Sequence, residues 1–212
     1  SGANIFLYNK DIFDKFAVPY PEDSMMWDEV YDLARDLTRT EDGVEYQGLV
    51  MQFDQLMGLN QLSAPYFNTD HKASFTDEAF ARVFQNFARF YEIPGLELSQ
   101  YSNLVPTNFI EAQTAAMALS TSGYARHAAN NLNHWDIASV PVFKEMPNTG
   151  FQASPEYFYI TSRSQNRDAS FQVLAFIASD EYQTWLGSEF ALLPVAKDPS
   201  QIIETFGASN PG

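Results

Sequence analysis

Cysteine is absent from the 212-residue chain, and basic residues are few. The missing cysteine excludes disulfide scaffolds, thiol nucleophiles, cysteine-ligated zinc and iron–sulfur clusters. Lysine and arginine number 12 against 27 aspartates and glutamates, which gives a formal net charge of -15. This balance argues against nucleic acid and anionic membrane surfaces as partners, because both select for lysine and arginine. No apolar run approaches the roughly 18–20 residues that span a bilayer.

The motifs of common catalytic and nucleotide sites are also missing. The sequence contains no Gly-x-Ser-x-Gly elbow, no Gly-x-Gly-x-x-Gly turn and no Gly-Lys-Ser/Thr loop. His127, His134 and Asp136 lie close in sequence but match no metal-binding spacing, so we interpret them as exposed helix-end and loop residues. We therefore expect no catalytic residue, no metal and no cofactor. A glycosidase-like pair of carboxylates stays open, although 27 acidic residues would form close pairs by chance.

The chain has enough apolar residues to form a hydrophobic core, because hydrophobic residues make up 45% and aromatic residues 15%. We expect strands at 5–8, 46–51, 116–119 and 137–140, and a β-prone run at 157–161. We expect helices at 10–16, 27–38, 53–62, 77–91, after Pro106, after the turn at 120–124, at 171–178 and at 180–187. Strands separated by helices in this way indicate an α/β architecture.

Several of these helices have a clear apolar face. In the second helix, the residues spaced for one buried face are Trp27, Val30, Ala34 and Leu37. In the helix that begins near Thr76, the expected buried residues are Phe80, Val83, Phe84, Phe87 and Tyr91. Near the end of the chain, a further apolar stripe consists of Phe171, Leu174, Ala175 and Ala178.

Aromatic residues stand beside small polar residues at several expected strand and helix ends. Aromatic faces stack on sugar rings, while amide, hydroxyl and carboxylate groups bond the ring hydroxyls. In an open α/β sheet, ligands bind outside the carboxyl ends of the strands. The candidate ligand-binding residues are therefore Tyr124, Gly123, Ser122, Tyr66, Asn60, Tyr157 and Glu156. The competing interpretation is packing, which applies to most of the 18 Phe, 11 Tyr and 3 Trp.

Four segments together resemble a known family. They are the Tyr-Asn-Lys-Asp segment in 7–13, the Trp-Asp-Glu helix in 27–34, the block 109–124 with Ala-Met and Gly-Tyr, and the block 169–194 that ends in Leu-Pro. In this order they resemble family 1 extracellular solute-binding proteins, the maltose-binding-protein-like receptors of ABC importers. The sequence departs from the family pattern at Gln113, where glycine is usual, and at Tyr124, where tryptophan is most frequent.

The resemblance implies an α/β, periplasmic-binding-protein-like (type 2) fold with two lobes joined by a hinge. Residues 1–150 would form the second, C-terminal lobe, with helices on a mixed sheet. Residues 151–212 would form the hinge return and the mainly helical part of the first, N-terminal lobe. The chain would then lack most of the N-terminal lobe and stop before the C-terminal helices.

The same resemblance implies a binding protein rather than an enzyme. It would enclose a mono- or oligosaccharide between two lobes and deliver it to the membrane permease of an ABC importer. It would work outside the cell as an anchored lipoprotein, or in the periplasm. The stripe of Phe171, Leu174, Ala175 and Ala178 would lose its cover and pack on another copy or on the second lobe. The alternatives are a carbohydrate-active enzyme with an unidentified carboxylate pair, and an interaction domain without a small ligand.

Overall fold

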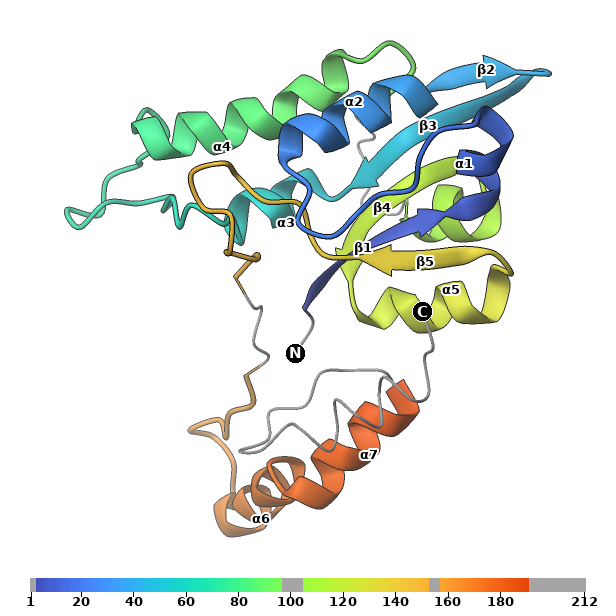
Figure 1. The fold of residues 1–212 in the computed structure, drawn as a ribbon. Helices are drawn as coiled ribbons and strands as arrows, with labels where there is room; N and C mark the ends of the chain where they lie inside the picture. Colours follow the sequence, from blue (N-terminus) through green and yellow to red (C-terminus); the bar gives the residue numbers. More distant parts are fainter. Residues whose placement is uncertain (1–2, 97–104, 153–156, 191–212) are drawn as a thin grey trace. The chain divides into compact units, whose positions relative to one another are not determined.

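The computed structural model describes residues 3–96, 105–152 and 157–190 (Figure 1). The chain divides into two compact units. Residues 4–152 form the larger unit, and residues 1–3 and 153–212 form the smaller one. The described part of the smaller unit contains helices α6 (Arg167–Ile177) and α7 (Asp180–Phe190). Within the described ranges, no helix is long and apolar enough to cross a membrane.

The larger unit is built on a five-stranded mixed sheet, which confirms the expected α/β class (Figure 1). The strand order is β2-β3-β4-β1-β5. Strands β3 and β4 run parallel, and every other neighbouring pair is antiparallel. The strands are β1 (Asn4–Asn9), β2 (Arg39–Glu41), β3 (Val44–Met51), β4 (Ala115–Thr121) and β5 (Trp135–Ala138).

Alternating side chains divide the core between the two faces of this sheet. Phe6 of β1 and Met117 of β4 belong to one hydrophobic cluster, whereas Leu7 and Ala118, one position on, belong to the other. The first cluster is covered by α1 (Lys10–Phe16), α2 (Trp27–Leu37), α3 (Phe53–Gly58) and α4 (Glu78–Ala88). The second is covered by the π-helix η2 (Val105–Glu111) and by α5 (Gly123–Asn131).

The indole of Trp27 lies at the centre of the larger cluster and is 2% exposed. Its Nε1 donates to Gln61 Oε1 over 3.0 Å. The Gln61 amide nitrogen in turn donates to the carbonyl oxygens of Pro141 at 2.7 Å and Thr149 at 2.8 Å. One buried side-chain pair therefore connects α2 to the turn after α3 and to the loop that follows β5.

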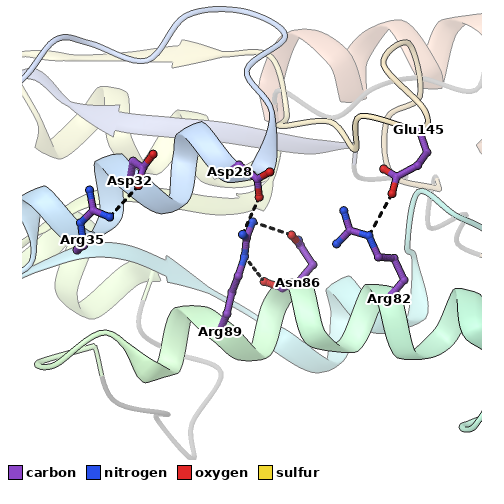
Figure 2. Close-up of polar contacts among 7 residues, drawn as sticks. All are labelled: Asp28, Asp32, Arg35, Arg82, Asn86, Arg89 and Glu145. Carbon is purple, nitrogen blue, oxygen red and sulfur yellow. Dashed lines mark hydrogen bonds and ion pairs between the residues drawn. The ribbon is translucent and has the colours of Figure 1, made fainter.

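Ion pairs connect α4, and the 3₁₀-helix η1 (Arg89–Glu92) that follows it, to their neighbours (Figure 2). Arg89 Nη1 lies 2.6 Å from Asp28 Oδ1 on α2, and the same guanidinium donates to the Asn86 side chain. Arg82 Nε lies 3.1 Å from Glu145 Oε1. These groups are partly exposed, so each pair stabilises the fold only modestly. Their charges are nevertheless partnered within the protein.

The structure corrects several expected elements. The β-prone run 157–161 is not a strand, because none of the described residues pairs with it. The helix expected over 53–62 ends at Gly58, and the helix expected after Pro106 is a π-helix. The short strand β2 was not expected, because all three of its residues are exposed and carry no apolar alternation. Phe84, expected in a buried stripe, is 47% exposed.

The smaller unit contains one helix cap and one uncovered stripe. Ser179 caps α7, since its Oγ accepts from the backbone N–H of Tyr182 at 3.3 Å. The apolar stripe of α6 is not covered within the described part of the chain, where no residue of α6 is buried and Phe171 is 65% exposed. Association with another copy through this stripe stays a prediction.

Gln113 adopts a left-handed backbone conformation, with φ at +53°. This conformation costs a residue other than glycine about 1–2 kcal/mol, whereas glycine adopts it freely but loses more chain entropy on folding. We expect Gln113→Gly to raise the free energy of unfolding by roughly 0.5–1 kcal/mol, measured by thermal or chemical unfolding. Gln113→Ala is the matched control, because it also removes the weak 3.5 Å contact to the Asn131 carbonyl. A glycine variant no more stable than the alanine variant would contradict this account.

Candidate functional site

Two parallel strands of the larger unit end at the same edge of the sheet. Met51 of β3 is paired with Leu119 of β4, so both strands finish at this edge. Helix α3 begins at Phe53 directly after β3, and α5 begins at Gly123 directly after β4. In open α/β sheets the crevice outside the carboxyl ends of such strands is where ligands bind. This edge is therefore the candidate site.

Ser122, Gly123 and Tyr124 lie at this edge, at the start of α5. The Ser122 carbonyl accepts from the Ala125 N–H at 3.1 Å, which begins the helix. A Cβ added to Gly123 would meet no atom within 4 Å, so the backbone here faces open space. The Tyr124 ring is half-buried against the second hydrophobic cluster, and its centroid lies 6.0 Å from that of His127. A ligand could approach this backbone and the exposed part of the ring.

Buried hydroxyl groups stand behind the same edge. The side-chain oxygens of Ser120 and Ser122 are enclosed and have no hydrogen-bond partner in the part of the chain that the structure describes. The first turn of α5 contains no acidic residue. The start of α5 therefore offers backbone N–H groups without an acid to repel an electron-rich ligand atom, whereas the two enclosed hydroxyls lie behind it.

Asn60 has a structural role that the sequence did not suggest. Its side chain is 1% exposed and donates to the carbonyl oxygens of Met57 at 2.8 Å and Ala64 at 3.0 Å. Its Oδ1 accepts from the Ala64 N–H at 2.8 Å. The amide thus closes the turn after α3. Ligand contact by this amide would require one of these bonds to break.

Tyr66 lies on an apolar groove beside α3 and α4. The groove has a volume of roughly 590 Å³, and the Tyr66 side chain is 39% exposed on it. The main lining residues are Phe53, Met57, Tyr66, Phe75, Phe80 and Phe84. The ring could stack on a sugar, but its surroundings supply few of the hydrogen-bond partners that sugar hydroxyls need.

The remaining candidates belong to the smaller unit. Tyr157 is 70% exposed, and Glu156 lies outside the described residues. The sequence reasoning missed Gln52 and Phe53, which follow β3 at the same edge as Ser122. The sequence does show a strand followed at once by a helix at this point. This pattern places Gln52 and Phe53 at the candidate site only when β3 is known to lie parallel to β4.

The titratable groups around His134 pair with one another, at the end of the sheet opposite the candidate site. Asp136 Oδ2 lies 2.6 Å from Lys10 Nζ, and His134 Nδ1 lies 2.9 Å from Asp11 Oδ1. Burial, together with the charge and hydrogen bond of Asp136, raises the pKa of Tyr8 to about 12. Among the described residues, no group of three or more histidine, aspartate or glutamate side chains is arranged to hold a metal ion. The Lys10–Asp136 pair joins the start of α1 to β5.

The chain matches the family model described as bacterial extracellular solute-binding protein over residues 1–184. No curated protein matches it. Among solved structures, it is similar to an ABC substrate-binding protein from Listeria monocytogenes in complex with cycloalternan. The two share 16% identity with a TM-score of 0.72, over 99% of this chain and 54% of that one.

Two other solved structures give the same result. A cyclic alpha-maltosyl-1,6-maltose binding protein from Arthrobacter globiformis is 19% identical with a TM-score of 0.70, over 99% of this chain and 56% of that one. An ABC transporter solute-binding protein from Thermotoga lettingae, bound with alpha-D-tagatose, is 19% identical with a TM-score of 0.67, over the same shares of the two chains.

These likenesses establish the fold as periplasmic-binding-protein type 2. The chain spans about half the length of the solved structures it matches. Family and fold are those of substrate-binding proteins, which are not enzymes, so a carbohydrate-active enzyme is set aside. The ordered motifs, the mixed sheet and the family match agree, and the chain belongs to the family of bacterial extracellular solute-binding proteins.

Proposed function

We propose that this chain forms part of a two-lobe receptor for an ABC importer. Residues 1–150 would form most of the second lobe, and residues 151–212 the hinge return and the helical part of the first lobe. The division of the chain between residues 152 and 153 supports this boundary. The receptor would work outside the cell, as an anchored lipoprotein or in the periplasm, and would deliver its solute to a membrane permease.

The proposed ligand is a mono- or oligosaccharide bound outside the carboxyl ends of β3 and β4. The observation that carries this is the edge where both strands end, with open space at Gly123 and the half-buried ring of Tyr124. Related structures bound to cycloalternan and to tagatose support a sugar as the solute. Closure of the first lobe onto the ligand would add further contacts, for which Tyr157 and Glu156 stay the candidates, and would favour the closed state.

A thermal-shift screen of the full-length protein against sugars and polyols tests this proposal. A ligand present at 100 times its Kd should stabilise the folded protein by about 2.7 kcal/mol. Tyr124→Ala should weaken binding about tenfold or more, because it removes the stacking face. Tyr124→Trp should preserve binding, because it keeps that face.

The control is Tyr46→Ala, which removes a tyrosine near the opposite end of β3, where it accepts a hydrogen bond from Lys15. Each variant is compared with its own ligand-free melting temperature, so lost packing does not count as lost binding. If no sugar or polyol shifts the melting temperature, the interaction domain without a small ligand is the better description. If Tyr46→Ala weakens binding as much as Tyr124→Ala, the site lies elsewhere.

A further inference from the structure

The groove beside α3 and α4 is distinct in chemistry from the edge at Gly123. Its volume of roughly 590 Å³ falls within the range of about 300–1,000 Å³ typical of small-molecule sites. The lining residues that the structure describes lie between positions 53 and 85, within the larger unit. Besides the six side chains named above, they include Ala81 and Gln85 of α4.

Aromatic rings fix one another around this groove. Phe53 and Phe84 meet edge to face with their centroids 5.6 Å apart, and this pair joins α3 to α4. Phe80 lies 5.1 Å from Phe75 and 5.8 Å from Tyr66, again between ring centroids. Phe75 is nevertheless 55% exposed and Phe84 47% exposed. The walls are therefore held in place by mutual contacts, while much of their apolar surface still faces the groove or solvent.

The described lining of the groove is uncharged in a chain of net charge -15. Of the side chains that the structure describes, none that lines it carries a charge. Arg82 follows Ala81 on α4, but its guanidinium lies 5.1 Å from the Phe143 ring centroid and pairs with Glu145 (Figure 2). Among the described lining side chains, none offers a counter-charge to a charged ligand. Their polar groups are the Tyr66 hydroxyl and the Gln85 amide, which are few for the hydroxyls of a sugar.

We propose that this groove is a second binding site, which takes a small uncharged aromatic molecule about the size of a naphthalene ring system. The ring edges and faces of the walls suit stacking and edge-to-face contact with such a molecule. This proposal does not rest on the proposed sugar receptor, because the described lining of the groove belongs to the larger unit alone.

The test is a fluorescence titration of the 212-residue chain with N-phenyl-1-naphthylamine, an uncharged probe that brightens in apolar sites. We expect saturable binding at one probe per chain, with a Kd on the order of 10 µM. Ala81→Trp, which fills the groove from a half-buried position on α4, should weaken binding about tenfold or more. Phe84→Ser removes part of the wall and should act in the same direction.

Far-UV circular dichroism establishes that each variant is folded, and Phe171→Ser is the matched control. It removes a phenylalanine of α6 in the other unit that is more exposed than Phe84, at 65% against 47%, so binding should be unchanged. Loss of binding in Phe171→Ser but not in Ala81→Trp would overturn the proposal, as would emission that never saturates.

Absence of probe binding would also overturn the proposal, because another occupant, such as a segment of the chain or a second copy, would then fill the groove. A failed sugar screen would leave this result unaffected, since the probe is observed directly.

Discussion

Replacing Gly48 with alanine is expected to lower the free energy of unfolding by about 3 kcal/mol or more. A Cβ at this position of β3 would overlap the carbonyl oxygen of Ala34 and lie 2.6 Å from its Cα. The obstacle is the backbone of α2, which cannot move aside as a flexible side chain would. Thermal unfolding should show a melting temperature lower by roughly 6–12 °C.

The close approach at Gly48 is fixed by Thr38, so the strand cannot easily shift. The Gly48 N–H donates to Thr38 Oγ1 at 2.9 Å, and the same hydroxyl donates to the Ala34 carbonyl at 2.6 Å. Gly150→Ala is the control, because a Cβ there meets only Val140 Cγ2 at an ordinary 3.8 Å. A Gly48→Ala protein as stable as Gly150→Ala would show that α2 and β3 can separate at little cost.

Local patterns in the sequence predicted the parts of the fold that depend on local forces. The spacing of Trp27, Val30, Ala34 and Leu37 identified the buried face of α2, and all four are buried. Asn9, a residue type typical of helix N-caps, precedes α1, and its side chain accepts from the Asp11 N–H at 3.0 Å. Periodicity and capping act within one or two turns, so they can be recognised without knowledge of the partners.

Features that depend on distant segments could not be recognised in this way. Phe84 is spaced along α4 as if it shared the buried face of that helix. It lies at the margin of that face, however, where the contact with α3 covers only part of its ring. Strand β2 has no apolar pattern and forms because the turn at Asp42 and Gly43 folds it back onto β3. Only the tertiary pairing distinguishes such a segment from a loop.

Ligand binding at the candidate site stays a prediction, but the position of its residues in the fold could be predicted in part. Ser122, Gly123 and Tyr124 follow a strand that the sequence indicates clearly, and the structure places them after β4. Gln52 belongs to the same edge only because β3 lies parallel to β4, and this pairing joins residues about 70 positions apart. The hydrogen bonds that occupy Asn60 are local, but nothing in residue type distinguishes a turn-closing asparagine from a ligand-binding one.

Removal of the Trp27 side chain is expected to be the most damaging single change in the larger unit. Trp27→Ala should lower the free energy of unfolding by about 3–5 kcal/mol through lost burial and a residual cavity. It also leaves the buried Gln61 Oε1 without its donor, which adds about 1–3 kcal/mol. The rings that would lose their contact with the indole belong to Phe87, Phe90, Phe143 and Phe151.

Trp27→Phe separates these two effects, because it keeps much of the ring packing and removes only the hydrogen-bond donor and some volume. We expect it to be intermediate between the natural protein and Trp27→Ala when all three are compared by urea unfolding. Gln61 also holds the carbonyls of Pro141 and Thr149, so the loop after β5 should lose hydrogen-exchange protection in both variants. If that loop stays protected while stability falls, Trp27 acts through packing alone, and the buried amide holds the loop without help from the indole.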